Sequence, residues 1–214
     1  MKPKLPTGKT QLQVRTARME AFSDGVFAIA ITLLVLDLAI PGSGNNLGHG
    51  LLEQWPEYLA YLVSFAAIGG AWINHNLITD HLEYTDPIFL RLNLLLLLFV
   101  AVIPFPTHLL LANFLGSMNS ERIAVTVYGA NLLAVSLLMS TLFHYAIRAK
   151  MIKKSAQDKE MGILTKKIDP TLLLYLVVIG IGLAFPHLAV FLYLLISIYI
   201  MIPFQSALQR SRRS

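Results

Sequence analysis

Six long apolar runs, separated by short polar connections, dominate the pattern along the chain. They cover residues 20–40, 57–79, 88–112, 123–147, 171–185 and 188–205. A helix needs about 20 mainly apolar residues to cross a bilayer, and five of the runs come close to or exceed that length. The fifth run is shorter, so it could form either a re-entrant hairpin or a full crossing of the membrane. The pattern predicts an all-α, polytopic membrane protein with six transmembrane helices in each subunit.

Composition agrees with a membrane protein. Of the 214 residues, 56% are hydrophobic and only 14% are charged, whereas a soluble domain carries about 25% charged residues. The chain has no cysteine, which excludes disulfides, thiolate metal sites and a cysteine nucleophile.

The basic residues predict the orientation in the membrane. All of the 17 lysines and arginines except Arg122 fall on one side of the six-span arrangement. Since positively charged loops stay in the cytosol, both termini are expected to be cytosolic. The expected organisation is a basic N-terminus (1–19), a transmembrane domain (20–205) containing a basic cytosolic linker (148–170), and a basic tail (206–214). These segments suit anionic lipid, and we expect no nucleic-acid partner.

The first apolar run carries an aliphatic stripe on one helical face. At about 100° per residue, the stripe spans about 100° of the helix circumference. Its members are Gly25, Ile29, Thr32, Leu33 and Leu36. Asp24 falls on the opposite face, about 140° from Ile29. An acid in a membrane span needs a partner inside the bundle or a water-filled path, so the two faces have separate tasks.

Candidate partners for Asp24 lie in the second run, in the stretch GGAWINHN. Trp72 and His75 are three residues apart and share a helical face. Their ring N–H groups are suitable donors to a carboxylate. In the alternative interpretation Trp72 is an aromatic of the membrane interface and His75 is a solvated residue at a loop edge.

Three stretches resemble a known family. RMEAFSDG (residues 18–25) fits the R-x-x-x-F-S-D signature of the endolysosomal potassium channel family known as transmembrane protein 175. WINH (residues 72–75) resembles the W-x-x-H of its second helix, and RLNLLLLLFVAVIPFPTHLL (residues 91–110) resembles its bacterial members. The resemblance implies a homotetramer whose pore is lined by the first helix.

The resemblance also assigns residues to roles. It places the pore constriction on Ile29, Leu33 and Leu36 and a hydroxyl layer on Thr32, which are members of the stripe found on the helical wheel. It implies that Asp24 anchors the pore helix within an intrasubunit network. That network comprises Arg18, Phe22, Ser23, Asp24, Trp72 and His75. No TVGYG filter sequence occurs in the chain.

The expected function is a potassium-permeable cation channel with a hydrophobic gate in a bacterial cytoplasmic membrane. Potassium and other monovalent cations are the expected permeant ions, with membrane lipid as surroundings and no cofactor. Asp37 is either an acid at the outer mouth or a plain interfacial residue before Pro41. A secondary transporter and a non-conducting scaffold are the alternatives, although the first span has no ionisable residue between Asp24 and Asp37.

An enzyme or a metal protein is not expected. The chain lacks a G-x-S-x-G nucleophile elbow, so Ser23, Asp24 and His75 do not suggest a hydrolase triad. The remaining histidines show no H-x-x-x-H or HExxH spacing of a zinc site.

Overall fold

The computed structural model describes residues 8–38, 47–114, 116–153 and 160–201. The side chains of residues 8–15, of Asp37 and of residues 160–169 lie outside this description. The described elements, in chain order, are α1 (Gly8–Leu33), the 3₁₀ helix η1 (Leu34–Asp37), α2 (Leu47–Glu53), α3 (Trp55–Thr79), α4 (Pro87–Val102), α5 (Pro104–Asn113), α6 (Met118–Arg148), α7 (Glu160–Gly182) and α8 (Pro186–Met201). Within these residues the chain is all-helical, as the sequence predicts.

Helices coincide with each of the six apolar runs. Three helical stretches are long and apolar enough to cross a membrane: Thr16–Leu36, Pro87–Asn113 and Met118–Arg148. The apolar parts of α7 and α8 are shorter. The chain therefore has the helices of a membrane protein, while the count of six crossings stays a prediction.

The helices extend beyond the apolar runs at two places. α1 begins at Gly8, inside the expected basic N-terminus, and α7 begins at Glu160, inside the expected linker. A helix can extend beyond an apolar run when the flanking polar residues have high helix propensity. Lys, Gln, Arg and Glu are such residues. Hydropathy marks where a membrane begins and does not mark where a helix begins.

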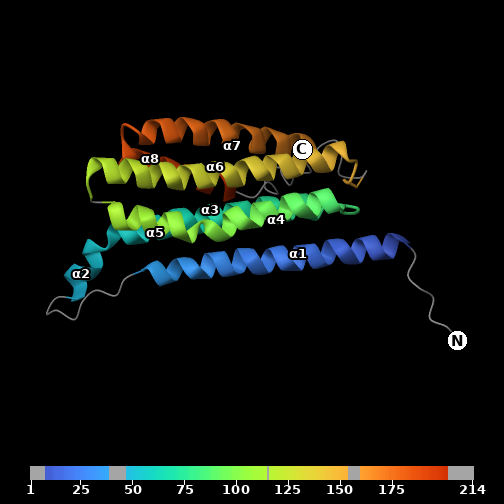
Figure 1. Ribbon diagram of the computed structural model, residues 1–214, viewed down its shortest axis with the longest axis horizontal. Coiled ribbons are helices and arrows are strands. Elements are labelled where there is room, and N and C mark those ends of the chain that lie inside the picture. The colour runs from blue at the N-terminus through green and yellow to red at the C-terminus, as the bar shows by residue number, and fades with distance from the viewer. Residues whose placement is uncertain (1–7, 39–46, 115, 154–159, 202–214) are drawn as a thin grey trace, which may run out of the picture.

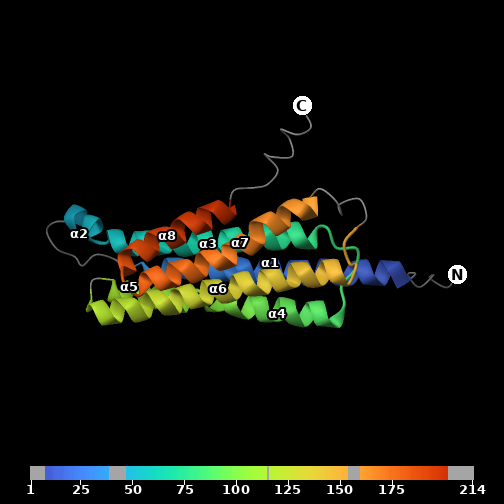
Figure 2. The ribbon, with the colours of Figure 1, turned by 90° about the horizontal axis from the view of Figure 1, so that it is seen from above.

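The helices form layers, with α1 on the outside. Figure 1 shows α1 along one side of the bundle, then α3 with α4 and α5, and then α6, α7 and α8. α1 packs on α3 and α4, α3 packs on α8, and α6 packs on α4 and α7. Successive long helices run in opposite directions, and Figure 2 shows α6 and α4 together on one side of the bundle and α3 and α8 on the other.

The turn before α4 is fastened to the chain that follows α6. Leu82 and Ile152 form an antiparallel bridge, and Glu83 N donates to Met151 O over 2.7 Å. Asp86 caps α4 by accepting from the Phe89 backbone N–H. These bonds fix the end of the bundle at which α1 also begins (Figure 1).

The third run is broken at Pro104, between α4 and α5. Since proline has no N–H, Val100 O accepts instead from Ile103 N at 3.1 Å. The Phe99 carbonyl, which Ile103 N would meet in an unbroken helix, accepts from Asn131 Nδ2 at 3.2 Å. α6 thus supplies a donor to the break.

A chain of hydroxyls stabilises the same break. Thr107 Oγ1 donates to Ile103 O at 2.8 Å, and Ser64 Oγ lies 2.7 Å from Thr107 Oγ1 and 3.0 Å from the Tyr128 hydroxyl. Because each hydroxyl has one proton, Ser64 donates to Thr107 and Tyr128 donates to Ser64. All three side chains are buried, so the break is a packed feature of the core.

Candidate functional site

α1 has one buried and one exposed face. The buried residues recur every three or four positions, the spacing of a single helical face, and pack against α3 and α4. They are Thr16, Met19, Ser23, Phe27 and Ala30 of α1, followed by Leu34 of η1. The residues between them are mostly exposed although most are apolar, so α1 is half covered in the single subunit.

The residues expected at the constriction lie on the exposed face. The exposed fraction is 61% for Ile29, 42% for Leu33 and 75% for Leu36. The 3₁₀ segment after Leu33 turns about 120° per residue, which moves Leu36 about 40° around the axis from its α-helical position. Leu36 nevertheless stays on the uncovered side. Asp37 ends η1, and its side chain lies outside the described ones.

Thr32 is exposed beside these aliphatic side chains. Its hydroxyl donates to the Ile29 carbonyl at 2.9 Å. With the single proton used inside the helix, the oxygen lone pairs are left as acceptors. The arrangement presents an oxygen, rather than an O–H, to whatever faces α1.

Asp24 is held by Trp72, as the sequence suggested. Trp72 Nε1 donates to Asp24 Oδ1 over 2.9 Å, joining α3 to α1. The bond lies at the exposed side of the interface and not in the interior. The carboxylate is therefore not buried, which differs from the expected partner inside the bundle. Its partner lies at the edge of the bundle because Asp24 and the buried residue Ser23 face different sides of α1.

A buried hydrogen-bonded chain links Ser23 to His75 through Asn93. Ser23 Oγ donates to Met19 O at 2.9 Å and accepts from Asn93 Nδ2 at 2.9 Å. Asn93 Oδ1 lies 2.8 Å from His75 Nε2. Since an amide oxygen only accepts, His75 carries its proton on Nε2. The Phe27 ring packs against the imidazole, with centroids 5.5 Å apart.

The Ser23–Asn93–His75 hydrogen bonds differ from the partners that the sequence suggested for His75. His75 is only 2% exposed, so it is not a solvated loop-edge residue. It bonds Asn93 rather than Asp24, because it faces the buried side of α1 and Asp24 does not. Sequence reasoning missed Asn93, although a lone amide in the run RLNLLLLL is the kind of polar residue that needs a partner inside a membrane bundle.

Arg18 and Phe22 lie elsewhere on α1. Both are exposed, Phe22 by 56%, and neither takes part in the hydrogen bonds described above. The structure thus brings together four of the six expected network residues, as two separate groups. Asp24 pairs with Trp72, and Ser23 reaches His75 through Asn93.

The chain contains a recognised family domain. Residues 18–104 match the family model described as "Endosomal/lysosomal potassium channel TMEM175". This stretch holds α3, α4 and the residues of α1 from Arg18 onward.

Relatives match over more of the chain. A potassium channel of Chamaesiphon minutus is 39% identical over 192 residues, which cover 87% of this chain and 94% of that protein. A potassium channel of Streptomyces collinus is 42% identical over 135 residues, covering 62% of this chain and 65% of that protein.

A solved structure shares the fold. The crystal structure of a lysosomal potassium-selective channel TMEM175 homolog from Chamaesiphon minutus superposes with a TM-score of 0.77 at 37% identity. The match covers 87% of this chain and 96% of that one. The family is one of ion channels and not a class of enzymes. The chain belongs to the TMEM175 family of potassium channels, and among its members it resembles the bacterial ones.

Proposed function

We propose that four copies of this chain form a potassium-permeable channel whose pore is lined by the exposed face of α1. The observation that carries the proposal is the position of Ile29, Leu33 and Leu36. They form an uncovered aliphatic stripe on the outermost helix of the bundle. Copies of α1 around a common axis would cover one another's stripes. The solved homolog, titled a potassium-selective channel, supports potassium as the ion.

The constriction works as a hydrophobic gate in this proposal. A ring of four Ile29 side chains excludes water when the helices are close and admits a partly hydrated ion when they separate. No TVGYG backbone filter is present in the sequence, so selection depends on side chains.

Thr32 supplies the oxygen ligands next to this ring. Its proton is bonded to the Ile29 carbonyl, which leaves lone pairs available to a cation. Four such oxygens replace part of the water around potassium. The smaller sodium ion, which holds its water more tightly, loses more on entry.

The buried chain and the Trp72–Asp24 bond fix α1 on the subunit. Ser23 and Asp24 are neighbours in α1, and one bonds Asn93 while the other bonds Trp72. Two adjacent anchors on different sides set both the depth and the rotation of the pore helix. Asp24 is a structural anchor and not a ligand of the permeant ion.

The proposed topology has six crossings with both termini in the cytosol of a bacterium and the protein in its cytoplasmic membrane. The basic end of the bundle then faces anionic lipid of the inner leaflet. In this topology Asp37, the last residue of η1, lies at the outer side, where four carboxylates would attract cations to the mouth at low salt.

Planar-bilayer recording of the purified protein tests the function. With potassium on one side and sodium on the other, the wild type should give discrete currents and a reversal potential biased toward potassium. Ile29→Asn should increase the current, because a polar ring wets the constriction. Ile123→Asn is a matched control, since Ile123 is also an exposed isoleucine, on α6 (55% exposed). It should leave the current unchanged.

Two results would contradict the proposal. A folded tetramer that stays silent in both the wild type and Ile29→Asn would leave the stripe as ordinary helix packing. Saturable flux that follows a coupling-ion gradient, without single-channel steps, would favour a transporter.

A further inference from the structure

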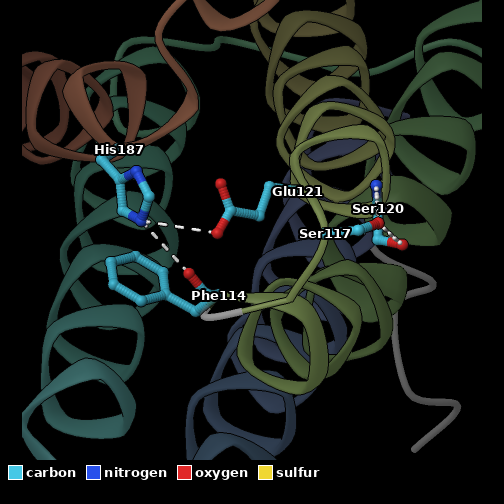
Figure 3. A network of polar contacts seen from close by, with 5 residues as sticks. All are labelled: Phe114, Ser117, Ser120, Glu121 and His187. Atoms are coloured by element: carbon cyan, nitrogen blue, oxygen red, sulfur yellow. Dashed lines mark hydrogen bonds and ion pairs between the residues drawn. The ribbon is translucent and has the colours of Figure 1, made fainter.

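At the end of the bundle where α6 and α8 begin, the fold brings together a histidine and a glutamate from these two helices (Figure 3). His187 lies in the first turn of α8 and Glu121 in the first turn of α6. His187 Nε2 is 3.6 Å from Glu121 Oε1 and 3.2 Å from the carbonyl oxygen of Phe114, the C-cap residue that follows α5. Two oxygen atoms from separate parts of the chain thus lie next to one ring nitrogen.

Glu121 is buried, whereas His187 is half exposed to solvent. The Glu121 side chain is 8% exposed, whereas that of His187 is 49% exposed. A buried carboxylate is usually paired or bound to a metal, and here the side chain beside it is an imidazole open to solvent. The same residues line a cavity of about 10 Å³, with Leu110, Val125 and Val190 as apolar walls. The carboxylate therefore sits at the bottom of a small pocket with the histidine at its entrance.

The separations match the edges of a metal coordination tetrahedron. Zinc binds imidazole nitrogen and carboxylate oxygen at about 2.0–2.2 Å, so two ligands of a tetrahedral site lie about 3.3–3.5 Å apart. The two separations from His187 Nε2, 3.2 and 3.6 Å, bracket this value.

We propose that this pocket binds a divalent cation of the zinc class. His187 Nε2, Glu121 Oε1 and the Phe114 carbonyl oxygen are the protein ligands, and water completes the tetrahedron. The Nε2 proton moves to Nδ1 when the metal binds, so the imidazole stays neutral and its Nε2 lone pair turns to the ion. The ionised Glu121 supplies the negative charge.

The ligand set determines the class of metal. Imidazole suits zinc and its transition-metal neighbours, whereas magnesium and calcium require six or more oxygen ligands. Within the described residues no group of three or more His, Asp or Glu side chains is placed to hold a metal. This site is different in kind, because a backbone carbonyl serves as the third ligand. The bound ion would tie the α5–α6 turn to the start of α8.

Thermal unfolding of the purified, untagged protein tests the site with ZnCl₂ as the probe and MgCl₂ as the comparison ion. The melting temperature of the wild type should rise by several degrees in zinc and stay unchanged in magnesium. A ligand that binds only the folded state raises the stability of that state. His187→Ala and the isosteric Glu121→Gln should both lose the zinc-dependent rise.

His49→Ala is the matched control. His49 and Glu53 form another His–Glu contact, at 3.2 Å, but both side chains are about two thirds exposed. This variant should keep the full zinc response. Loss of the response in His49→Ala, its persistence in His187→Ala, or no response in the wild type would each overturn the assignment.

A second measurement needs no substitution. Crystals of the wild type soaked in ZnCl₂ should give an anomalous peak at the zinc edge between His187 and Glu121. Peaks only at other positions would overturn the proposal. Neither experiment depends on ion conduction, so its outcome is separate from that of the channel proposal.

Discussion

Asn93 donates to Ser23 Oγ at 2.9 Å and thereby joins the third apolar run to the first. Its amide oxygen meets His75 of the second run, at 2.8 Å. One buried amide, 1% exposed, thus connects three helices at the level of the signature sequence.

Asn93→Leu should destabilise the subunit. The substitution removes two hydrogen bonds and leaves the Nε2–H of His75 buried without an acceptor. An unsatisfied buried group costs about 1–3 kcal/mol, so we expect a loss of about 2–4 kcal/mol in the free energy of unfolding once both bonds are counted. Denaturant unfolding in detergent measures it. A loss below about 0.5 kcal/mol would show that the chain contributes little.

Trp72 and Asp24 should show energetic coupling. Trp72→Phe removes the indole donor and keeps most of the ring, and Asp24→Ala removes the acceptor, whereas asparagine would keep an amide oxygen that still accepts. Because the bond lies at the exposed edge of the interface, we expect a coupling energy of about 1 kcal/mol in a double-mutant cycle. Additive single effects would mean that the bond forms without stabilising the fold.

Gly129 should not tolerate a side chain. A Cβ at Gly129 of α6 would overlap the hydroxyl oxygen of Tyr193 and lie 2.7 Å from its Cζ. Tyr193 is fully buried, so it has no room to move. Gly129→Ala should therefore destabilise the protein by about 1–3 kcal/mol through overpacking.

Gly180→Ala is the matched control for that prediction. A Cβ at Gly180 of α7 meets nothing within 4 Å, and alanine favours a helix over glycine by about 1 kcal/mol. The melting temperature should stay level or rise. Equal destabilisation by the two substitutions would contradict the close approach at Gly129.

Thr32→Ala should reduce selectivity more than conduction. In the proposed tetramer the substitution removes four hydroxyl oxygens, so the potassium-to-sodium preference should fall while the proposed Ile29 ring still limits the current. Reversal potentials under bi-ionic conditions measure the preference. Thr141→Ala is a suitable control, since Thr141 is an exposed threonine of α6 whose hydroxyl also bonds a carbonyl within its helix. An unchanged preference in Thr32→Ala would refute the role of the hydroxyl layer.

Features encoded by local spacing could be predicted from the sequence. The apolar runs and the stripe containing Ile29 follow from hydropathy and the helical repeat, which need no tertiary information. The bond between Asp24 and Trp72 was also suggested, because both residues stand at the same depth of adjacent spans.

Features that depend on packing between distant segments could not be predicted. The Asn93 bridge, the Asn131 donor at the α4–α5 break and the meeting of His187 with Glu121 each join residues of different helices. The starts of α1 at Gly8 and of α7 at Glu160 were missed for another reason. Polar helical turns outside the membrane have no hydropathy signal.

The break at Pro104 bears on how this protein can handle ions. Transporters use unwound backbone in interrupted helices as a source of carbonyl ligands for their coupling ions. Here Phe99 O is already bonded by the Asn131 amide, and Ile103 O accepts both the backbone N–H and the hydroxyl of Thr107. Both of these carbonyls thus already accept hydrogen bonds from the protein's own donors. In the proposed channel the ion is met by the exposed face of α1, and the Phe99 and Ile103 carbonyls at the break are already engaged within the subunit.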